Sequence, residues 1–415
     1  MSQVLLLQQD ARQVPVRDGS VHLVVTSPPY WNLRDYGEPN QIGLEKLHDC
    51  LGWATGNRCG SCYLCVMVAV FRECYRILRN DGVMFVIVGD SYNAHPGQRK
   101  VSDAAGVKQQ TNTGAVACAS RSVASLKPKD LCGIPQRLAL ALQAAGWTWR
   151  SEIIWSKGNP MPESVQDRPT KSHEQILMFT KQERYFWDQE AVREEAVYGD
   201  HHAKYQGTYT SHKIEALQEK GALNGAQYQV GLQMAAKNPY FRNLRDVWHL
   251  NSEPTSHAHY ATFPTELVSR CIRAGSPETC CGSCGKGRQR VVEYGEYDGP
   301  VTRGTQGYSS VGKQRDSGVG GLQRRSRLSS TLEPACSCPP DPVPSLVYDP
   351  FLGSGTTVLV ARQLRRHGIG GDLSAAYLAI ARERLGLKAL AAWEGRAQAS
   401  QEPVLVDGLP LFQGI

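Results

Sequence analysis

The stretch 26–31, Thr-Ser-Pro-Pro-Tyr-Trp, combines side chains and backbone groups suited to holding a planar amine. Pro28 and Pro29 lack an N–H and have φ fixed at about −65°, so the turn is stiff and its carbonyl groups remain as acceptors. Ser27 adds a hydroxyl acceptor, while Tyr30 and the tryptophan after it add flat aromatic faces. We therefore predict a rigid holder for a planar ring with an amino group; a Pro-Pro turn beside core aromatics is the alternative.

A second stretch, Ser345–Thr357, runs from a short apolar strand through a glycine turn into an apolar helix. Gly353 and Gly355 allow the backbone to approach a ligand closely, and the helix N-terminus offers free N–H groups. A phosphate-binding loop would need a Lys after the second glycine, and a dinucleotide fingerprint would need a third glycine where Val358 stands. Neither phosphate-binding pattern is present.

An acidic residue follows at the end of the next short strand, Ile369–Asp372. In this position, after a glycine loop, a carboxylate is placed to bind ribose hydroxyls. Asp349 and Phe351, in the loop itself, could meet an amino group and an adjacent apolar surface. A ligand with a ribose, an amino-acid end and no pyrophosphate points to S-adenosylmethionine.

The elements that must position these residues alternate between strands and helices. Apolar runs predict strands at residues 4–7, 21–25, 83–88, 173–180 and in a run that ends at 155. Helical spacing predicts helices at 66–78 and 135–145, the first ended by Asn80–Gly82. This alternation predicts an α/β fold with a parallel, doubly wound sheet.

The composition is that of a soluble globular protein with one large domain or two: 415 residues, 41% hydrophobic and 20% charged. A net charge of +7 is compatible with a polyanionic partner. The early apolar run lacks the features of a signal peptide, and no stretch could span a bilayer, so we predict a cytoplasmic protein without a membrane partner. In that reducing compartment, 13 cysteines suggest metal ligands.

Two groups of cysteines have spacings that suit zinc, which four thiolates bind tetrahedrally. The first group is Cys50, Cys59, Cys62 and Cys65. The second, a CxxC knuckle closed by a CxC pair, is Cys281, Cys284, Cys336 and Cys338, with Cys280 as a substitute for Cys281. We predict one or two zinc ions; reduced thiols without a metal are the alternative.

Three regions lack the regular hydrophobic periodicity of helices or strands. Residues 93–125 are rich in Gly, Ser and Ala and predict a mobile loop. Residues 181–251 interleave cations with aromatics, which suits nucleic-acid contact, although a solvated insertion has the same composition. Residues 288–327, rich in Gly, Ser and Arg, predict disorder in the absence of DNA.

Thr26–Trp31 early and Asp349–Thr357 late resemble the catalytic and cofactor motifs of the amino-group DNA methyltransferases, in the permuted order called the β class. Lys127–Lys181 and Ala258–Ile272 resemble the same family, so the likeness covers roughly two thirds of the chain. The resemblance implies a Rossmann-like S-adenosylmethionine-dependent methyltransferase fold with permuted motifs and a target-recognition region. The cysteine spacing, which the family motifs do not explain, adds predicted zinc-binding insertions to this fold. The resemblance also implies a bacterial or phage origin.

The resemblance divides the chain into successive units. The expected units are a catalytic half (1–180, with the cysteine insertion at about 48–65 and the mobile loop 93–125), a target-recognition region (181–255), a helix returning to the core (256–275), a zinc-knuckle and Arg/Gly-rich insertion (276–342), a cofactor-binding half (343–390) and a tail (391–415).

The resemblance implies a mechanism in which the target base is flipped out of double-stranded DNA. Hydrogen bonds from the exocyclic amine would be accepted by the Ser27 hydroxyl and the Pro28 carbonyl. Pro29 continues this motif, and Tyr30 would stack on the base. The nitrogen would then attack the methyl group in line, without a covalent enzyme intermediate. The implied cofactor-binding residues are Asp349, Pro350, Phe351, Gly353, Ser354, Gly355, Thr356, Asp372 and Phe263.

The residue before Pro-Pro-Tyr bears on the target base. Members of the family with Ser at this position mostly resemble cytosine-N4 enzymes, whereas Asp is commoner in adenine-N6 enzymes, so we predict N4 of cytosine, with adenine N6 as the alternative. A non-catalytic zinc-dependent DNA-binding protein and an RNA or protein amino-methyltransferase are more distant alternatives. The family resemblance allows a restriction endonuclease partner, and the sequence leaves the oligomeric state open.

Overall fold

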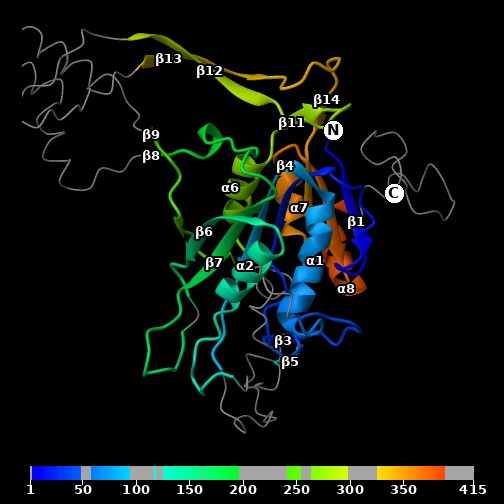
Figure 1. Cartoon of the computed structure of the whole chain (residues 1–415), viewed down its shortest axis with the longest axis vertical. Helices are drawn as coiled ribbons and strands as arrows, with labels where there is room; N and C mark the ends of the chain where they lie inside the picture. Colours follow the sequence, from blue (N-terminus) through cyan, green and yellow to red (C-terminus); the bar gives the residue numbers. More distant parts are fainter. Residues whose placement is uncertain are drawn as a thin grey trace, which may run out of the picture.

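The computed structural model describes residues 2–47, 58–93, 116–117, 125–160, 162–195, 241–253, 263–297 and 325–387. Its centre is an eight-stranded sheet (Figure 1). In spatial order the strands are β1 (Val4–Gln8), β16 (His367–Asp372), β15 (Leu346–Asp349), β2 (Val21–Thr26), β4 (Leu78–Val88), β7 (His173–Thr180), β6 (Thr148–Ser156) and β10 (Val247–His249). No helix in these ranges is long and apolar enough to cross a membrane.

The sheet is parallel except at β7, which runs antiparallel to both β4 and β6. The predicted parallel sheet is therefore confirmed for the other strands and wrong for β7. The described part of the connection from β6 to β7 contains no helix. Without a helical crossover the chain turns back at the same edge of the sheet, and the next strand must point the other way.

Helices cover both faces of the sheet, which confirms the doubly wound arrangement (Figure 1). α1 (Tyr63–Ile77) and α2 (Ile134–Ala144) pack on one face, and α6 (Thr265–Gly275) and α7 (Thr356–Gln363) pack on the other. Alternate residues of β2 serve the two cores: Val24 packs with α1, while Leu23 and Val25 pack with α6. Every residue of β2 is buried, as its continuous apolar run predicts.

The remaining elements lie at the edges. α8 (Ala375–Arg384) packs beside β1 and β16. Short pieces are β3 (Arg34–Asp35), β5 (Val116–Ala117), η3 (Glu190–Val192), β8 (Glu194–Glu195) and β9 (Phe241–Arg242). Residues 80–82, which we expected to end the first helix, lie inside β4, because that strand begins directly after Ile77.

The insertion between α6 and β15 forms two small antiparallel sheets. β11 (Thr279–Cys281) pairs with β14 (Pro342–Pro344), and β12 (Gln289–Tyr297) pairs with β13 (Arg325–Glu333) as a ribbon that projects from the core (Figure 1). The predicted disorder of 288–327 is wrong within these strands, because cross-strand pairing supplies the order that composition alone does not indicate. Residues 298–324, most of the predicted mobile loop, most of the recognition region and the tail lie outside the described residues.

Candidate active site

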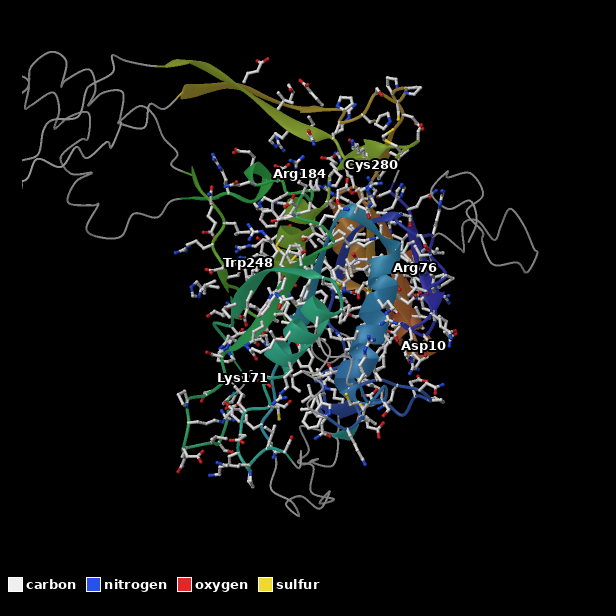
Figure 2. The ribbon with its side chains drawn as sticks, viewed as in Figure 1. Asp10, Arg76, Lys171, Arg184, Trp248 and Cys280 are labelled. Atoms are coloured by element: carbon white, nitrogen blue, oxygen red, sulfur yellow. The ribbon has the colours of Figure 1, made fainter. Side chains whose placement is uncertain are left out.

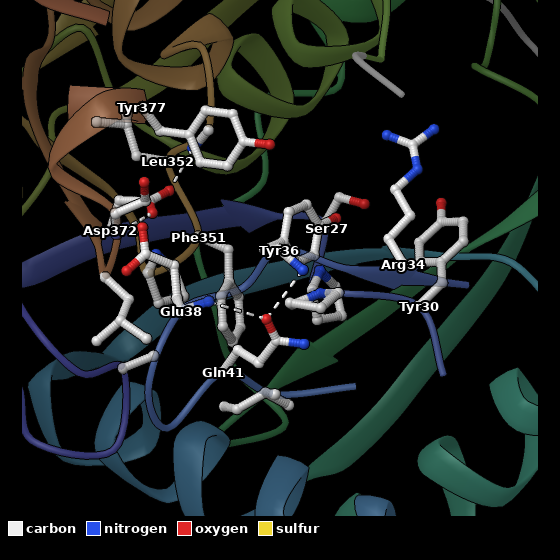
Figure 3. A pocket seen from close by; sticks show the side chains of 18 of the residues that line it. Ser27, Tyr30, Arg34, Tyr36, Glu38, Gln41, Phe351, Leu352, Asp372 and Tyr377 are labelled. Carbon is white, nitrogen blue, oxygen red and sulfur yellow. Dashed lines mark hydrogen bonds between the residues drawn. The ribbon is translucent and has the colours of Figure 1, made fainter. Parts of the chain in front are cut away.

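The carboxyl ends of β2, β15 and β16 open into one pocket (Figure 3). Parallel α/β sheets bind ligands at this edge, where strands end and loops begin. β2 pairs directly with β15, so the two stretches singled out in the sequence are neighbours. The predicted residues that line the pocket are Ser27, Pro28, Pro29, Tyr30, Phe263, Pro350, Phe351, Gly353, Ser354, Thr356 and Asp372.

Asp349 and Gly355 do not line this pocket. Asp349 is buried beneath it, where its Oδ1 accepts hydrogen bonds from the Thr26 hydroxyl at 2.7 Å and from the Phe351 amide at 3.0 Å. Its Oδ2 is buried without a partner among the described residues. Burial raises the pKa of Asp349 to about 6, despite these hydrogen bonds. Asp349 thus fastens the end of β2 to the end of β15.

The glycine turn is held by Asp372. Its Oδ2 accepts a hydrogen bond from the Gly353 amide at 2.8 Å, and its Oδ1 accepts one from the Ser374 amide at 2.9 Å. Burial raises the pKa of Asp372 above its usual value. Gly353 and Gly355 have φ of 51° and 82°, a region that favours glycine. A Cβ at Gly355 would lie 3.1 Å from the Ala381 Cβ, so this glycine lets α8 approach the turn.

Tyr30 forms a fixed aromatic wall. Its hydroxyl donates to Glu174 Oε2 at 2.6 Å, and the other oxygen of Glu174 pairs with Lys157. Burial and the charge of Glu174 hold the pKa of Tyr30 well above its usual range. The ring lies against Gly89, where an added Cβ would be 2.7 Å from Tyr30 Cε2. The sequence indicated the aromatic ring but not the carboxylate and ammonium that hold it.

Only one of the two proline carbonyl groups of the Pro-Pro turn is unpaired in the described part of the chain, whereas the sequence predicted both to be unpaired. The carbonyl of Pro29 accepts a hydrogen bond from the Tyr63 hydroxyl at 2.9 Å. The carbonyl of Pro28 has no hydrogen-bond partner within the described part of the chain. Trp31 is 2% exposed and donates to the Glu45 carbonyl, so its expected aromatic face belongs to the core and not to the pocket.

The loop after the Pro-Pro turn roofs the pocket. Residues 33–42 contribute several lining side chains, among them Tyr36, Glu38 and Gln41. The Tyr36 ring meets the Tyr377 ring edge-on, with centroids 6.0 Å apart. Gln41 Oε1 accepts from the Tyr36 amide at 2.9 Å (Figure 3). Glu38 and Tyr377 are site residues that the sequence analysis missed, because no motif marks them.

No described member of either cysteine group lines this pocket. The sulfur atoms of Cys281, Cys284, Cys336 and Cys338 all lie within 4.8 Å of one another. Cys280 faces the Pro344 carbonyl, so it does not substitute for its neighbour. In the first group, the sulfur atoms of Cys59, Cys62 and Cys65 meet the same distance criterion, and Cys50 lies outside the described residues.

This chain is similar to a DNA methylase family and to several Type II methyltransferases. The DNA methylase family profile matches residues 21–283 and 335–383. Type II methyltransferase M.Cfr9I of Citrobacter freundii is 39% identical over 279 residues, which are 65% of this chain and 72% of the relative. Type II methyltransferase M.XycI of Xanthomonas campestris pv. cyanopsidis is 33% identical over 380 residues, which are 90% of this chain and 83% of the relative.

Solved structures are similar at lower identity. The PvuII DNA methyltransferase (cytosine-N4-specific) is 13% identical with a TM-score of 0.47, over 95% of this chain and 94% of that one. A Thermus thermophilus protein complexed with S-adenosyl-L-methionine is 19% identical with a TM-score of 0.43, over 93% and 95%. With the family profile and the two relatives above, the chain belongs to the DNA methylase family as an S-adenosylmethionine-dependent amino-group DNA methyltransferase.

Proposed function

We propose that the protein transfers a methyl group to N4 of a flipped cytosine in a specific sequence of double-stranded DNA. One observation carries the proposal: Ser27 and Tyr30 share a single pocket with Phe351 and Asp372. The groups expected to hold the base therefore adjoin the groups expected to hold the methyl donor.

The described residues fit S-adenosylmethionine. Asp372 uses one lone pair on each oxygen for backbone amides, so further lone pairs remain for ribose hydroxyls. Phe351 adds an apolar wall, and the positive φ of Gly353 brings backbone to the same surface. When bound, the cofactor supplies a methyl group activated by a sulfonium.

The chain itself supplies orientation. The Ser27 hydroxyl and the Pro28 carbonyl are the acceptors for the exocyclic amine, which draws its lone pair out of conjugation with the ring. Tyr30, fixed by Glu174, offers a face on which the base stacks. Catalysis then rests on holding the nitrogen in line with the methyl group, so proximity and orientation lower the barrier.

The proposed target base rests on the family resemblance of one short motif. The Ser27 hydroxyl accepts equally well from N4 of cytosine and from N6 of adenine, so the choice rests on the Ser-Pro-Pro-Tyr motif. Adenine N6 is the second candidate.

Nucleoside analysis tests the target base. Unmethylated duplex DNA is incubated with the protein and methyl-labelled S-adenosylmethionine, digested, and resolved by mass spectrometry. We expect labelled N4-methyldeoxycytidine. Labelled N6-methyldeoxyadenosine alone would overturn the cytosine assignment, and label in RNA or protein but not in DNA would overturn the substrate class.

The relatives named above are Type II methyltransferases, and we extend this to a restriction-modification role for this chain. Residues 181–255 are the proposed target-recognition region. Sequencing of the methylated product should show one short motif modified at every copy. Methylation scattered without a common motif would contradict site specificity.

A further inference from the structure

We infer that Cys281, Cys284, Cys336 and Cys338 bind one structural zinc ion that locks the 276–342 insertion onto the catalytic sheet. We call these four cysteines the clasp. The inference goes beyond the proposed function, because it concerns the opposite end of the sheet and needs no assumption about the base.

The sulfur positions suit zinc. All four lie within 4.8 Å of one another. A tetrahedral zinc with Zn–S bonds of about 2.3 Å separates its sulfurs by about 3.8 Å. The four sulfur atoms are therefore close enough to share one ion, and four soft thiolates favour zinc over harder cations.

The backbone of the clasp already has the form of a zinc knuckle. The Gly285 amide donates to the Cys281 carbonyl at 2.7 Å, and Gly285 has φ of 69°. This tight turn brings the sulfur atoms of Cys281 and Cys284 within 4.8 Å of each other and of the sulfur atoms of the CxC pair.

The surroundings of the clasp contribute little buried apolar surface. None of the described residues between 282 and 342 belongs to a hydrophobic core cluster. Segments without enough apolar surface to bury gain folding free energy from a structural zinc. Cys280, adjacent in sequence, is instead 1% exposed, which makes it the natural control.

The clasp is bonded to the core at the amino ends of β2 and β4. Arg79 donates to the Cys284 carbonyl at 3.1 Å. His22 Nδ1 accepts from the Leu346 amide at 3.1 Å, so the neutral ring carries its proton on Nε2 and donates it to the Gly285 carbonyl at 2.8 Å. Burial lowers the pKa of His22 to about 4, which keeps this ring neutral.

The distance between the clasp and the pocket indicates a structural role for the zinc. The pocket lies at the carboxyl end of β2, and a strand of six residues spans roughly 20 Å. Figure 2 shows the two ends of the molecule, with Cys280 near the clasp and Lys171 at the end that carries the pocket. A metal at the clasp is therefore too distant to touch the reacting base.

Zinc analysis of the full chain tests the inference. Wild type, Cys284→Ser and Cys280→Ser are purified without chelator, and zinc per chain is measured by plasma mass spectrometry. We expect Cys284→Ser to lose one zinc equivalent relative to wild type and Cys280→Ser to lose none. Because the readout is a difference, any zinc held by Cys59, Cys62 and Cys65 cancels.

Cobalt substitution of the wild type covers the case in which Cys284→Ser does not fold. We expect thiolate-to-cobalt charge-transfer and tetrahedral d–d bands, retained in Cys280→Ser and reduced by Cys338→Ser. Equal zinc content in wild type and Cys284→Ser, or a mass corresponding to disulfides among the four cysteines, would overturn the inference. Neither result depends on which base is methylated, so failure here leaves the proposed function intact.

Discussion

Ser27 is the side chain through which the pocket is expected to orient the amine, and removal of its hydroxyl isolates that contribution. We expect Ser27→Ala to lower the single-turnover rate of methyl transfer about twofold to tenfold, since a neutral hydrogen bond contributes about 0.5 to 1.5 kcal/mol. Affinity for S-adenosylmethionine should be retained. Ser20→Ala, which removes a buried hydroxyl bonded to the Arg17 carbonyl, is the control. An unchanged rate in Ser27→Ala would contradict the role.

Two substitutions of Tyr30 separate the contribution of ring stacking from that of the hydroxyl hydrogen bond. Tyr30→Ala removes the ring, and we expect the KM for DNA to rise about 10- to 100-fold, because base stacking contributes about 1 to 3 kcal/mol. Tyr30→Phe keeps the ring and leaves Glu174 paired with Lys157, so its effect should be several-fold smaller. Steady-state kinetics on duplex DNA measure both. Equal effects would show that the hydroxyl matters more than the ring.

The buried carboxyl of Asp349 predicts a pH dependence of stability. Burial raises its pKa from 3.8 to about 6. The folded state therefore holds the proton more tightly than the unfolded state, and the resulting stabilisation, roughly 3 kcal/mol, is complete below about pH 4 and is lost as pH rises through 6.

Urea unfolding of the ligand-free protein across this pH range checks the sign. Asp349→Asn should remove this component, so the difference in unfolding free energy between wild type and variant should fall as pH rises. Contributions from the buried histidines are common to both proteins and cancel in the difference. A pH-independent difference would contradict the raised pKa.

At the scale of elements, the roof loop is joined to α8 by one ring contact. Edge-on aromatic pairs contribute about 0.5 to 1.5 kcal/mol beyond their burial. We therefore expect Tyr377→Ala to weaken S-adenosylmethionine binding about threefold to tenfold, and Tyr377→Phe to leave it unchanged, because the ring against Tyr36 is kept. Calorimetric titration measures both affinities, and equal weakening would assign the effect to the hydroxyl instead.

The sequence indicated those elements whose signals are local. A fully apolar run identified β2, helical spacing identified α1, and the glycine turn before Thr356 identified the start of α7. The pocket itself was predictable because two such strands end in chemically distinctive turns, and parallel strands bring those turns to one edge.

Features set by distant partners were not predictable. The direction of β7 depends on the path of the chain between β6 and β7. The composition of that connection does not indicate this path. From its sequence position, Trp31 was expected to line the pocket. In the folded chain its ring N–H instead donates to the Glu45 carbonyl. Glu174 and Tyr377 meet Tyr30 and Tyr36 only after the chain has folded, across separations that no short motif spans.

At the scale of the whole molecule, the two ends of the sheet carry different structural features. The ribbon of β12 and β13 projects from the amino end of the sheet (Figure 1). The clasp lies at the amino ends of β2 and β15, and the pocket lies at their carboxyl ends. Residues 288–327 contain more cationic than acidic side chains, which suits contact with phosphates.

Trimming the ribbon separates DNA binding from chemistry. With residues 292–330 replaced by a Gly-Ser turn, we expect the KM for DNA to rise in a salt-dependent way and kcat at saturating DNA to stay within about twofold. The ion pair of Arg290 with Asp188 is preserved in this design. A large loss of kcat would show that the ribbon acts on the pocket, and an unchanged KM would show that it does not contact DNA.

The pairing of β1 with β16 has a consequence for synthesis. Val4 lies opposite Gly368, and Ser27, made early, shares its pocket with Asp372, made late. Contacts between such distant segments cannot form until the second partner has left the ribosome. A chain interrupted before β16 therefore holds the expected base-binding turn but lacks Asp372, the carboxylate expected to bind the cofactor. We therefore expect a chain terminated before β16 to be inactive.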